Sequence, residues 1–359
     1  MKTKSWVVVE PERMELQEFD VPTVDDDGIL MRVTMVSICG SDPKYYFGHQ
    51  NTEYLPMIMG HEVVGVVEEI GREAEQTYGV KKGDRITVEP YANCGECDFC
   101  QSGYYQLCRN TYIYGCKKSC KDEKHLWGGY GEFLYIGPGS HVYLVGDDIP
   151  DEAAVFSSVI GNGYRMMKTK GEVDSTKDVV VWGPGALGLC GVVAAKELGA
   201  RQIIVVGLEK DSIRLQLAKE LGADHIIMSD KVNAVDEIKR LTGGEGAHVS
   251  VECTGFPKIY NDVIFSTRTT GTIVLIGLNS KQDNPVYTDN IIQRELTVKG
   301  CVGQPHNCED AMETINNGIY PIEKMATHAF TMDRMDEAFQ FSLSNDPSLI
   351  RVVVTPEEK

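Results

Sequence analysis

The first 150 residues contain short apolar runs separated by Gly, Pro and Asp, a pattern typical of short β-strands joined by turns. The runs predict strands at residues 5–10, 29–37, 62–70, 85–89, 132–136 and 142–144. Because the strands are short and the turns frequent, this part of the chain is expected to form a β-rich domain shaped as a distorted barrel.

The pattern changes after residue 177, where apolar runs alternate with helix-like stretches such as residues 212–221. The apolar runs are residues 178–182, 202–209, 225–229, 249–255 and 271–278. Their alternation with helices predicts a parallel, doubly wound sheet covered on both faces. We expect a helical segment at residues 151–170 to join the two parts. After a helix at residues 332–343, a last strand at 350–355 is expected to return to the first domain.

Composition narrows the class of protein. A chain of 359 residues, 42% of them hydrophobic, exceeds the size at which one core stops growing, which predicts two domains. The formal net charge of −18 argues against a nucleic-acid partner, because phosphate binding requires clustered Lys and Arg. The N-terminus lacks a signal-peptide core and the longest apolar stretch is broken by Gly and Pro, so no membrane segment is expected. Eleven cysteines, an odd number, favour a reducing cytoplasm over a disulfide framework.

Four cysteines with the spacing C-x2-C-x2-C-x7-C bring four soft thiolates onto one loop. They are Cys94, Cys97, Cys100 and Cys108. This is the ligand set of a closed, structural tetrahedral zinc site. An iron-sulfur cluster is the competing interpretation, but the compact ferredoxin run would place its fourth cysteine three residues on and before a proline, whereas Cys108 precedes Arg109. Zinc is therefore favoured.

A glycine-rich turn follows the first parallel strand and matches G-x-G-x-x-G. Its residues are Gly183, Pro184, Gly185, Ala186, Leu187 and Gly188. Because the turn opens an apolar helix, its backbone N–H groups and the helix dipole are expected to face the pyrophosphate of a dinucleotide. Glu209, twenty-one residues beyond Gly188, lies where an acid accepts from the adenosine ribose, which favours NAD over NADP. The alternative is a solvated strand-end charge, and Lys210 beside it would soften the preference.

Two further motifs precede the cysteine loop: Cys39-Gly40-Ser41-Asp42, and Gly60-His61-Glu62 followed by Gly65 and Gly71. In this order, the motifs resemble those of the zinc-containing medium-chain alcohol and polyol dehydrogenases, most closely the sorbitol and threonine dehydrogenase branch. The resemblance covers essentially the whole chain. It implies a GroES-like distorted β-barrel catalytic domain at residues 1–159 and 302–359, and a Rossmann NAD-binding domain at residues 160–301.

The resemblance also implies a catalytic zinc held by Cys39 and His61 in a cleft between the domains, with Glu62 as a possible ligand. Asp42 is then expected to accept the other imidazole N–H of His61 and fix its tautomer. The zinc would act as a Lewis acid that lowers the pKa of the alcohol, so that hydride passes to C4 of the nicotinamide. Ser41 falls where the family has a Ser or Thr that passes on the alcohol's proton.

The chain departs from the family pattern at two positions. Alignment places Ser158 where the family has an anionic third ligand of the catalytic zinc, and a neutral hydroxyl is a poor ligand unless Glu62 replaces it. Lys44 stands where many relatives have the histidine that ends the proton relay. It is either a relay group with a depressed pKa or an exposed amine beside water.

Several other residues carry open interpretations. Cys116 and Cys120, with His125 nearby, form either another metal site or, preferably, ordinary loop thiols. Arg351 either reaches the cofactor pyrophosphate, as in some relatives, or forms a surface ion pair. Four residues after the Cys39 motif are candidates for the substrate pocket: Tyr45, Tyr46, His49 and Tyr54.

The leading hypothesis is thus an NAD-dependent zinc oxidoreductase acting on a small-molecule secondary alcohol, which is a polyol, a sugar or an amino alcohol. One alternative is a zinc-free enoyl or quinone reductase that uses NADPH, but those relatives lack both the Cys39 motif and the cysteine loop. The other is a non-catalytic NAD-binding protein in which Ser158 marks a decayed metal site. A dimer or tetramer is expected from the family.

Overall fold

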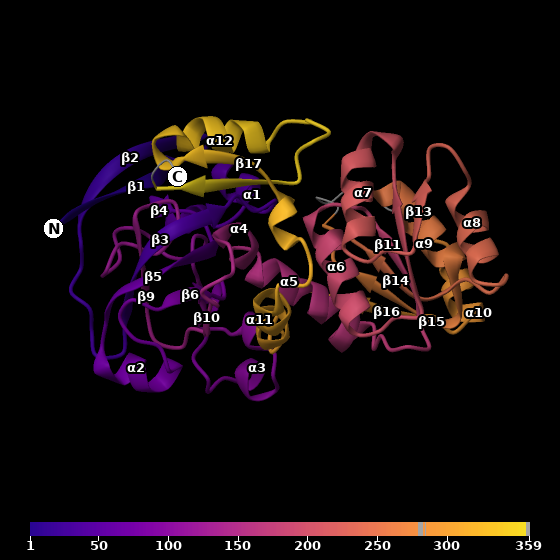
Figure 1. Ribbon diagram of the computed structural model, residues 1–359, viewed down its shortest axis with the longest axis horizontal. Coiled ribbons are helices and arrows are strands. Elements are labelled where there is room, and N and C mark those ends of the chain that lie inside the picture. Colours follow the sequence, from indigo (N-terminus) through magenta and orange to yellow (C-terminus); the bar gives the residue numbers. More distant parts are fainter. Residues whose placement is uncertain (279–282, 284, 357–359) are drawn as a thin grey trace. The chain divides into compact units, whose positions relative to one another are not determined.

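The computed structural model describes residues 1–278, 283 and 285–356, and within them the chain forms two units (Figure 1). Unit 1 consists of Met1–Ser158 and Ile315–Lys359, and unit 2 of Val159–Thr314. The C-terminal segment therefore belongs to the same unit as the N-terminus. None of the described helices is long and apolar enough to cross a lipid bilayer.

Unit 1 is built mainly from β-strands. Its strands are β1 Lys2–Glu10, β2 Arg13–Asp20, β3 Ile29–Ser37, β4 Met57–Ile58, β5 Glu62–Ile70, β6 Arg85–Val88, β7 Tyr91–Ala92, β8 Tyr112–Ile113, β9 Phe133–Ile136, β10 Val142–Leu144, β17 Ala326–Thr331 and β18 Arg351–Thr355. Its helices are α1 Asp42–Tyr46, α2 Arg72–Tyr78, α3 Asp98–Gln101, α4 Asp151–Ala154 and α12 Met335–Ser342. Two helices, α5 Ser157–Tyr164 and α11 Cys308–Asn317, cross the boundary between the units.

The main sheet of unit 1 has the strand order β10-β6-β5-β3-β18-β17, with β9 also paired to β3. β3 and β5 form its centre because both are nearly continuous apolar runs whose side chains are buried. A smaller sheet, β2-β1-β4, lies beside it and shares its core, since Val7 and Val8 of β1 belong to the same buried cluster as the β3 residues. The expected return of the last strand is confirmed: β18 pairs antiparallel with β3, and Figure 1 shows yellow strands beside indigo ones.

Unit 2 contains a parallel sheet with the order β13-β12-β11-β14-β15-β16. Its strands are β11 Asp178–Trp182, β12 Gln202–Gly207, β13 His225–Met228, β14 Ala247–Glu252, β15 Thr267–Leu275 and β16 Thr297–Gly300. Its helices are α6 Ala186–Glu197, α7 Ser212–Glu220, α8 Ala234–Leu241, α9 Tyr260–Ser266 and α10 Thr288–Gln293. The order reverses at β11, which makes this a doubly wound sheet of Rossmann type.

Helices cover both faces of the parallel sheet, as predicted. α6 contacts α7, while α8 contacts α9 (Figure 1). Because parallel crossovers are right-handed, the change of direction at β11 puts the two helix pairs on opposite faces. The strands between them are consequently apolar on both sides, and the β11 residues are all buried. The helical segment expected at 151–170 is present as α4, α5 and a π-helical turn at Arg165–Lys170.

The sequence pattern did not predict β2, β16 or α11. In β2 the side chains alternate between exposed and half-buried, and within the described part of the chain it pairs with β1 alone, so few apolar positions mark it. β16 is an edge strand in which Thr297, Val298 and Gly300 are exposed. Edge strands need less burial than central ones, and they are therefore weakly marked by hydrophobic periodicity.

Candidate metal centres and dinucleotide site

The four loop cysteines converge in unit 1. Measured sulfur-to-sulfur distances are 3.4 Å for Cys94–Cys108, 3.5 Å for Cys97–Cys100, 3.9 Å for Cys97–Cys108 and 4.0 Å for Cys94–Cys100. Sulfurs around a zinc ion at 2.3 Å in tetrahedral geometry lie about 3.8 Å apart. All four thiols are free, and these separations are far longer than a disulfide bond. The donor set therefore fits a tetrahedral metal ion.

Local structure and electrostatics of this loop also suit a cation. Hydrogen bonds from the backbone N–H groups of Arg109 and Cys100 lower the pKa of Cys97 to about 6. Cys100 lies in α3, which begins directly after Cys97. By contrast, partial burial and the neighbouring thiols raise the pKa of Cys100 to about 12. Four crowded sulfurs thus resist ionising together, and a divalent cation would remove that repulsion.

A second donor set forms at one end of the main sheet of unit 1. β3 pairs antiparallel with β5 so that Ser37 is opposite Glu62, which brings the residues just after β3 next to those that start β5. One ligand atom each from Cys39, His61 and Glu62 then lies within 4.8 Å of the others. His61 is 9% exposed and Glu62 3% exposed.

One carboxylate oxygen of Glu62 accepts from Arg351, and the other has no partner among the described residues and could bind a cation. Its Oε1 accepts from Nη2 of Arg351 at 3.3 Å, and Arg351 also donates to the carbonyl oxygen of Ile38 at 3.2 Å. Its Oε2 is buried and has no hydrogen-bond partner among the described residues. A buried, orphaned carboxylate oxygen is costly unless an ion binds it, so this set also fits a metal.

His61 is held from its Nδ1 side. Asp42 Oδ1 lies 3.4 Å from Nδ1, and the Cys116 sulfur lies 3.6 Å from the same atom. The other oxygen of Asp42 accepts from the Cys39 N–H at 2.9 Å and from the Tyr130 hydroxyl at 2.7 Å. Burial disfavours the charged imidazolium, but the nearby Cys116, Cys39 and Asp42 outweigh it and raise the pKa of His61. This arrangement leaves Nε2 as the ring atom for a metal.

Sequence reasoning missed three of these contacts. Cys116 was interpreted as an ordinary loop thiol, yet the chain folds its sulfur against His61. Tyr130 anchors Asp42, and a Gly-flanked tyrosine gave no sequence signal for this role. Arg351 is buried and pairs with Glu62, so the interpretation of Arg351 as part of a surface ion pair is wrong. The contact of Arg351 with a cofactor pyrophosphate stays a prediction.

The other site residues predicted from the sequence differ in how close they lie to the group of Cys39, His61 and Glu62. Ser41 donates to the Cys39 sulfur at 3.3 Å, and Lys44 lies in α1 with a half-buried side chain. Tyr45 lies close to Cys116 and His61, and burial together with the Cys116 charge raises its pKa. Tyr46 instead donates to the Glu12 carbonyl and packs against Phe339, which makes it a core residue rather than a pocket residue. Ser158 is buried near the start of α5.

The glycine turn of unit 2 has the backbone that a pyrophosphate site needs. Gly183 has φ of 101°, and a Cβ at Gly188 would lie 2.0 Å from the Gly183 carbonyl oxygen. Gly185 is the N-cap residue of α6, and no side chain caps this helix. A Cβ placed at Gly185 would have no atom within 4 Å. The turn therefore presents bare backbone to open space at the carboxyl end of β11.

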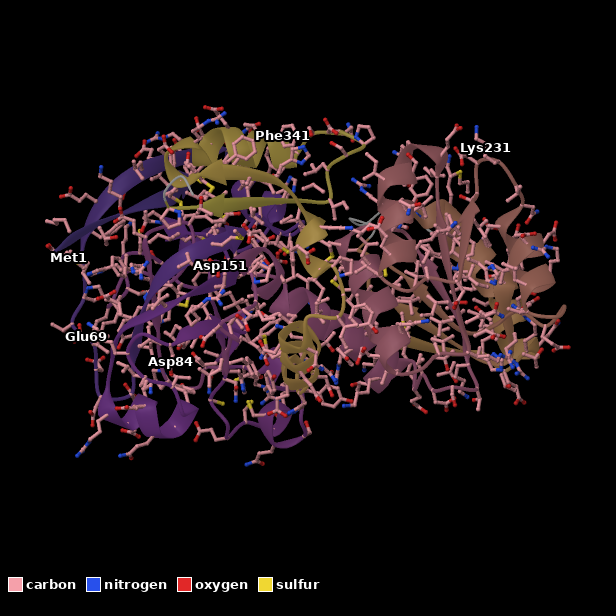
Figure 2. All side chains as sticks on the ribbon, viewed as in Figure 1. Met1, Glu69, Asp84, Asp151, Lys231 and Phe341 are labelled. Carbon is pink, nitrogen blue, oxygen red and sulfur yellow. The ribbon has the colours of Figure 1, made fainter. Side chains whose placement is uncertain are left out.

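Glu209 follows β12 and is exposed. Its carboxylate pairs with the ammonium of Lys231 at 2.5 Å, and its N–H donates to Asp230 at 3.0 Å. Figure 2 shows Lys231 at the periphery of unit 2. The Glu209 carboxylate thus pairs with Lys231, which follows β13, and the softening of the NAD preference by the adjacent Lys210 stays a prediction.

Comparison with known proteins agrees with these features. Residues 25–147 match the family model of the alcohol dehydrogenase GroES-like domain, and residues 186–317 match that of zinc-binding dehydrogenases. The chain is 29% identical over 357 residues to a sorbitol dehydrogenase of Bacillus subtilis, covering 98% of this chain and 97% of that protein. It is 32% identical over 333 residues to an L-threonine 3-dehydrogenase of Pyrococcus abyssi, covering 91% of both.

Solved structures give the same result. An alcohol dehydrogenase of Thermotoga maritima superposes with a TM-score of 0.89 at 27% identity, covering 99% of this chain and 100% of the other. The predicted fold class, a Rossmann sheet with a GroES-like domain, is confirmed.

Proposed function

The chain belongs to the zinc-binding medium-chain alcohol dehydrogenases, and on this premise we propose that it oxidises a secondary alcohol group of a polyol, sugar or amino alcohol to a ketone. It is an NAD-dependent zinc oxidoreductase that transfers hydride between an alcohol and NAD. The observation that supports zinc-assisted oxidation is the convergence of Cys39, His61 and Glu62 with an orphaned Glu62 oxygen, and similarity to the sorbitol and threonine dehydrogenases supports the class of alcohol.

When bound, zinc supplies Lewis acidity that makes an alcohol easier to deprotonate, and NAD supplies the hydride acceptor. The chain contributes the ligand set and its orientation. Asp42 and Cys116 hold the Nδ1 side of His61, while Tyr130 and the Cys39 N–H hold Asp42. Positioning contacts of this kind keep a metal-binding imidazole in one tautomer and one orientation.

Glu62 rather than Ser158 is proposed as the third protein ligand of the catalytic zinc. A carboxylate oxygen is a common zinc ligand, whereas a neutral hydroxyl is a poor one. Arg351 binds Oε1 and leaves Oε2 available, so the side chain is already turned with one oxygen free.

Ser41 is proposed to pass the alcohol proton onward. Its hydroxyl rests 3.3 Å from the Cys39 sulfur, close to the ligand set. Lys44, three residues later on α1, is proposed as the next group of the relay. A hydroxyl relays a proton by rotating between an acceptor and a donor, which a single O–H permits.

The two alternatives have less support. A zinc-free reductase has no use for a cluster of four sulfurs in which neighbouring sulfurs lie 3.4–4.0 Å apart. A non-catalytic NAD-binding protein has no need of a buried carboxylate with one oxygen unpaired beside Cys39 and His61. Assembly as a dimer or tetramer and a cytoplasmic location stay predictions.

The test of the proposed function combines metal analysis with an activity screen. Protein purified without added metal should contain two zinc ions per chain and reduce NAD with at least one compound in a panel of polyols, sugars and amino alcohols. Simple primary alcohols serve as the comparison substrates. Tight NAD binding with no turnover of any panel compound would contradict the proposal.

Cofactor preference gives a separate prediction. Glu209→Gln should weaken NAD binding about tenfold and improve the use of NADP, because the amide neither accepts as strongly from a ribose hydroxyl nor repels a 2′-phosphate. The readout is the ratio of kcat/KM for NAD to that for NADP.

Lys231→Met is the matched control for this prediction. Removal of the Lys231 ammonium breaks its 2.5 Å ion pair with Glu209 and leaves the carboxylate available to the ribose, so the preference for NAD should be kept or increased. An unchanged cofactor ratio in the Glu209 variant would mean that Glu209 is only a solvated charge.

A further inference from the structure

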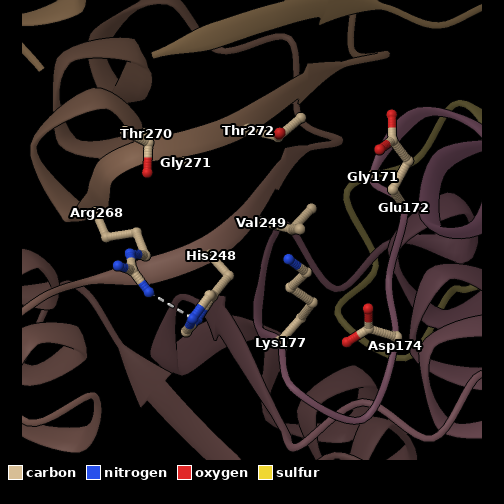
Figure 3. A pocket seen from close by; sticks show the side chains of 10 residues that line it. All are labelled: Gly171, Glu172, Asp174, Lys177, His248, Val249, Arg268, Thr270, Gly271 and Thr272. Carbon is tan, nitrogen blue, oxygen red and sulfur yellow. Dashed lines mark hydrogen bonds between the residues drawn. The ribbon is translucent and has the colours of Figure 1, made fainter. Parts of the chain in front are cut away.

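A pocket opens in unit 2 away from the glycine turn. Its volume is about 360 Å³, within the range of small-molecule sites. The lining residues that matter here are Lys177, just before β11, His248 in β14, and Arg268 and Thr272 in β15 (Figure 3). These residues belong to the amino ends of the parallel strands.

The dinucleotide turn lies at the other edge of the same sheet. β11 has five residues, which span about 16 Å in a parallel strand. Gly183 follows its last residue, whereas Lys177 precedes its first. The pocket is therefore separate from the pyrophosphate position, and nothing in the proposed function uses it.

Two of the side chains that line this pocket, Lys177 and Arg268, are cationic hydrogen-bond donors. Figure 3 shows one hydrogen bond among the lining side chains, from Nη1 of Arg268 to Nε2 of His248 at 2.7 Å. The buried Nε of Arg268 has no partner among the described residues. In the same view the Lys177 ammonium points into the space between the β14 and β15 side chains and the 171–174 segment.

The two carboxylates in the lining already have partners. Glu172 pairs with Lys299 at 2.6 Å, and the Asp174 carboxylate accepts from the hydroxyl and N–H of Thr176 at 2.6 and 2.8 Å. These contacts lower the pKa values of Glu172 and Asp174, so both are ionised. The charge of Glu172 is balanced by Lys299, whereas Asp174 is bonded only to neutral donors and also attracts Lys177. The two cations of the lining, Lys177 and Arg268, therefore face one carboxylate that has no ion-pair partner of its own, which leaves an excess of positive charge.

His248 acts as a positioning residue for Arg268. Burial and then the adjacent Arg268 charge lower its pKa, which keeps the imidazole neutral and able to accept at Nε2. Asp178 Oδ2 lies 3.4 Å from its Nδ1. The guanidinium is thereby fixed at Nη1, and its Nε is buried, so a planar, forked contact with a ligand is left to the N–H groups of Nη1 and Nη2.

Backbone strain occurs at two points of the pocket wall. Glu172 and Thr270 have φ values of 51° and 63°, in the left-handed region that non-glycine residues rarely adopt. This conformation is especially unfavourable for a β-branched residue such as Thr270. Residues with strained backbones occur most often at ligand-binding and switch regions.

From these observations we infer that the pocket binds a small phosphate-type oxyanion through Arg268, Lys177 and the Thr272 hydroxyl. Arg268 supplies the fork, Lys177 a point charge, and Thr272 a neutral donor. The ligand is free phosphate or the phosphate group of a small phosphomonoester.

Calorimetric titration of the zinc-loaded, NAD-saturated enzyme with inorganic phosphate tests this inference. NAD fills the pyrophosphate site, and chloride at matched ionic strength accounts for general salt effects. We expect saturable binding that weakens tenfold or more in both Arg268→Met and Lys177→Met. Lys219→Met, an exposed lysine of α7 outside the pocket lining, should bind phosphate as the wild type does.

Two additional measurements test the role of the guanidinium and the source of the phosphate. Arg268→Lys keeps the positive charge but loses the forked guanidinium, so its affinity for phosphate should lie between those of the wild type and Arg268→Met. Tighter binding of methyl phosphate than of inorganic phosphate identifies a phosphomonoester, and the reverse order identifies free phosphate. Absence of saturable binding in the wild type, or equal binding in wild type and Lys177→Met, would overturn the site. Neither result bears on alcohol oxidation, so this inference fails or survives independently.

Discussion

His61→Ala is expected to lower NAD reduction by at least about 10³-fold and to reduce the zinc content from two ions per chain to one. His61 is one of three donors, of which His61 and Glu62 are buried and Cys39 is half-buried, and removal of the imidazole leaves Cys39 and Glu62 to hold the ion alone. Loss of a Lewis acid removes several kcal/mol of transition-state stabilisation, and each 1.36 kcal/mol is a factor of ten in rate. Turnover measurement and elemental analysis on the same sample check both effects.

His49→Ala provides the matched control. His49 is an exposed histidine ten residues after Cys39, and its ring lies 6.1 Å from that of Phe47. This variant should keep both zinc ions, because His49 belongs to neither donor set. Full activity of His61→Ala at one zinc per chain would refute the assignment of the catalytic ligands, and a circular dichroism spectrum like that of the wild type would show that the variant is folded.

Cys100→Ala is expected to remove the other zinc and to lower the free energy of unfolding by about 4 kcal/mol or more, because metal binding to such a site is part of the folding free energy. Burial and the neighbouring thiols raise the pKa of Cys100, so a cation stabilises its thiolate in this loop. Denaturant unfolding and zinc content measure the effect. The remaining zinc should support turnover at low temperature.

Cys120→Ser separates this effect from the general loss of a thiol. The Cys120 sulfur donates to the Pro56 carbonyl at 3.2 Å, a contact that a serine hydroxyl can keep. Its zinc content should stay at two and its stability close to that of the wild type. Retention of two zinc ions in Cys100→Ala would mean that the cysteine loop is not the structural site.

Buried strands were predicted from the sequence more accurately than exposed ones. The predicted strands at 29–37 and 62–70 match β3 and β5 residue for residue, because both lie in the sheet centre and their apolar runs are continuous. β2 and β16 were missed because a strand with one neighbour needs few apolar side chains. The parallel sheet of unit 2 was predicted because its central strands β11 and β12 are almost entirely buried and therefore apolar on both faces.

The cysteine loop and the glycine turn are local motifs. Fifteen consecutive residues contain all four sulfurs, and six consecutive residues contain the turn, so their chemistry can be inferred from spacing alone. The group of Cys39, His61 and Glu62 is different. The structure brings these residues together through the pairing of β3 with β5, and the sequence suggested it only through resemblance to a family. Their catalytic roles stay predictions.

The sequence by itself determined the two-part architecture, the parallel sheet, the four-sulfur loop and the dinucleotide turn, because periodicity and short spacings encode them. Only the tertiary structure decided that Arg351 lies against Glu62, that Cys116 and Tyr130 support His61 and Asp42, and that Lys231 pairs with Glu209. The partners in these contacts are separated by 22 to 289 residues along the chain. Contacts of this kind depend on strand pairing and loop placement, which hydrophobic periodicity does not specify.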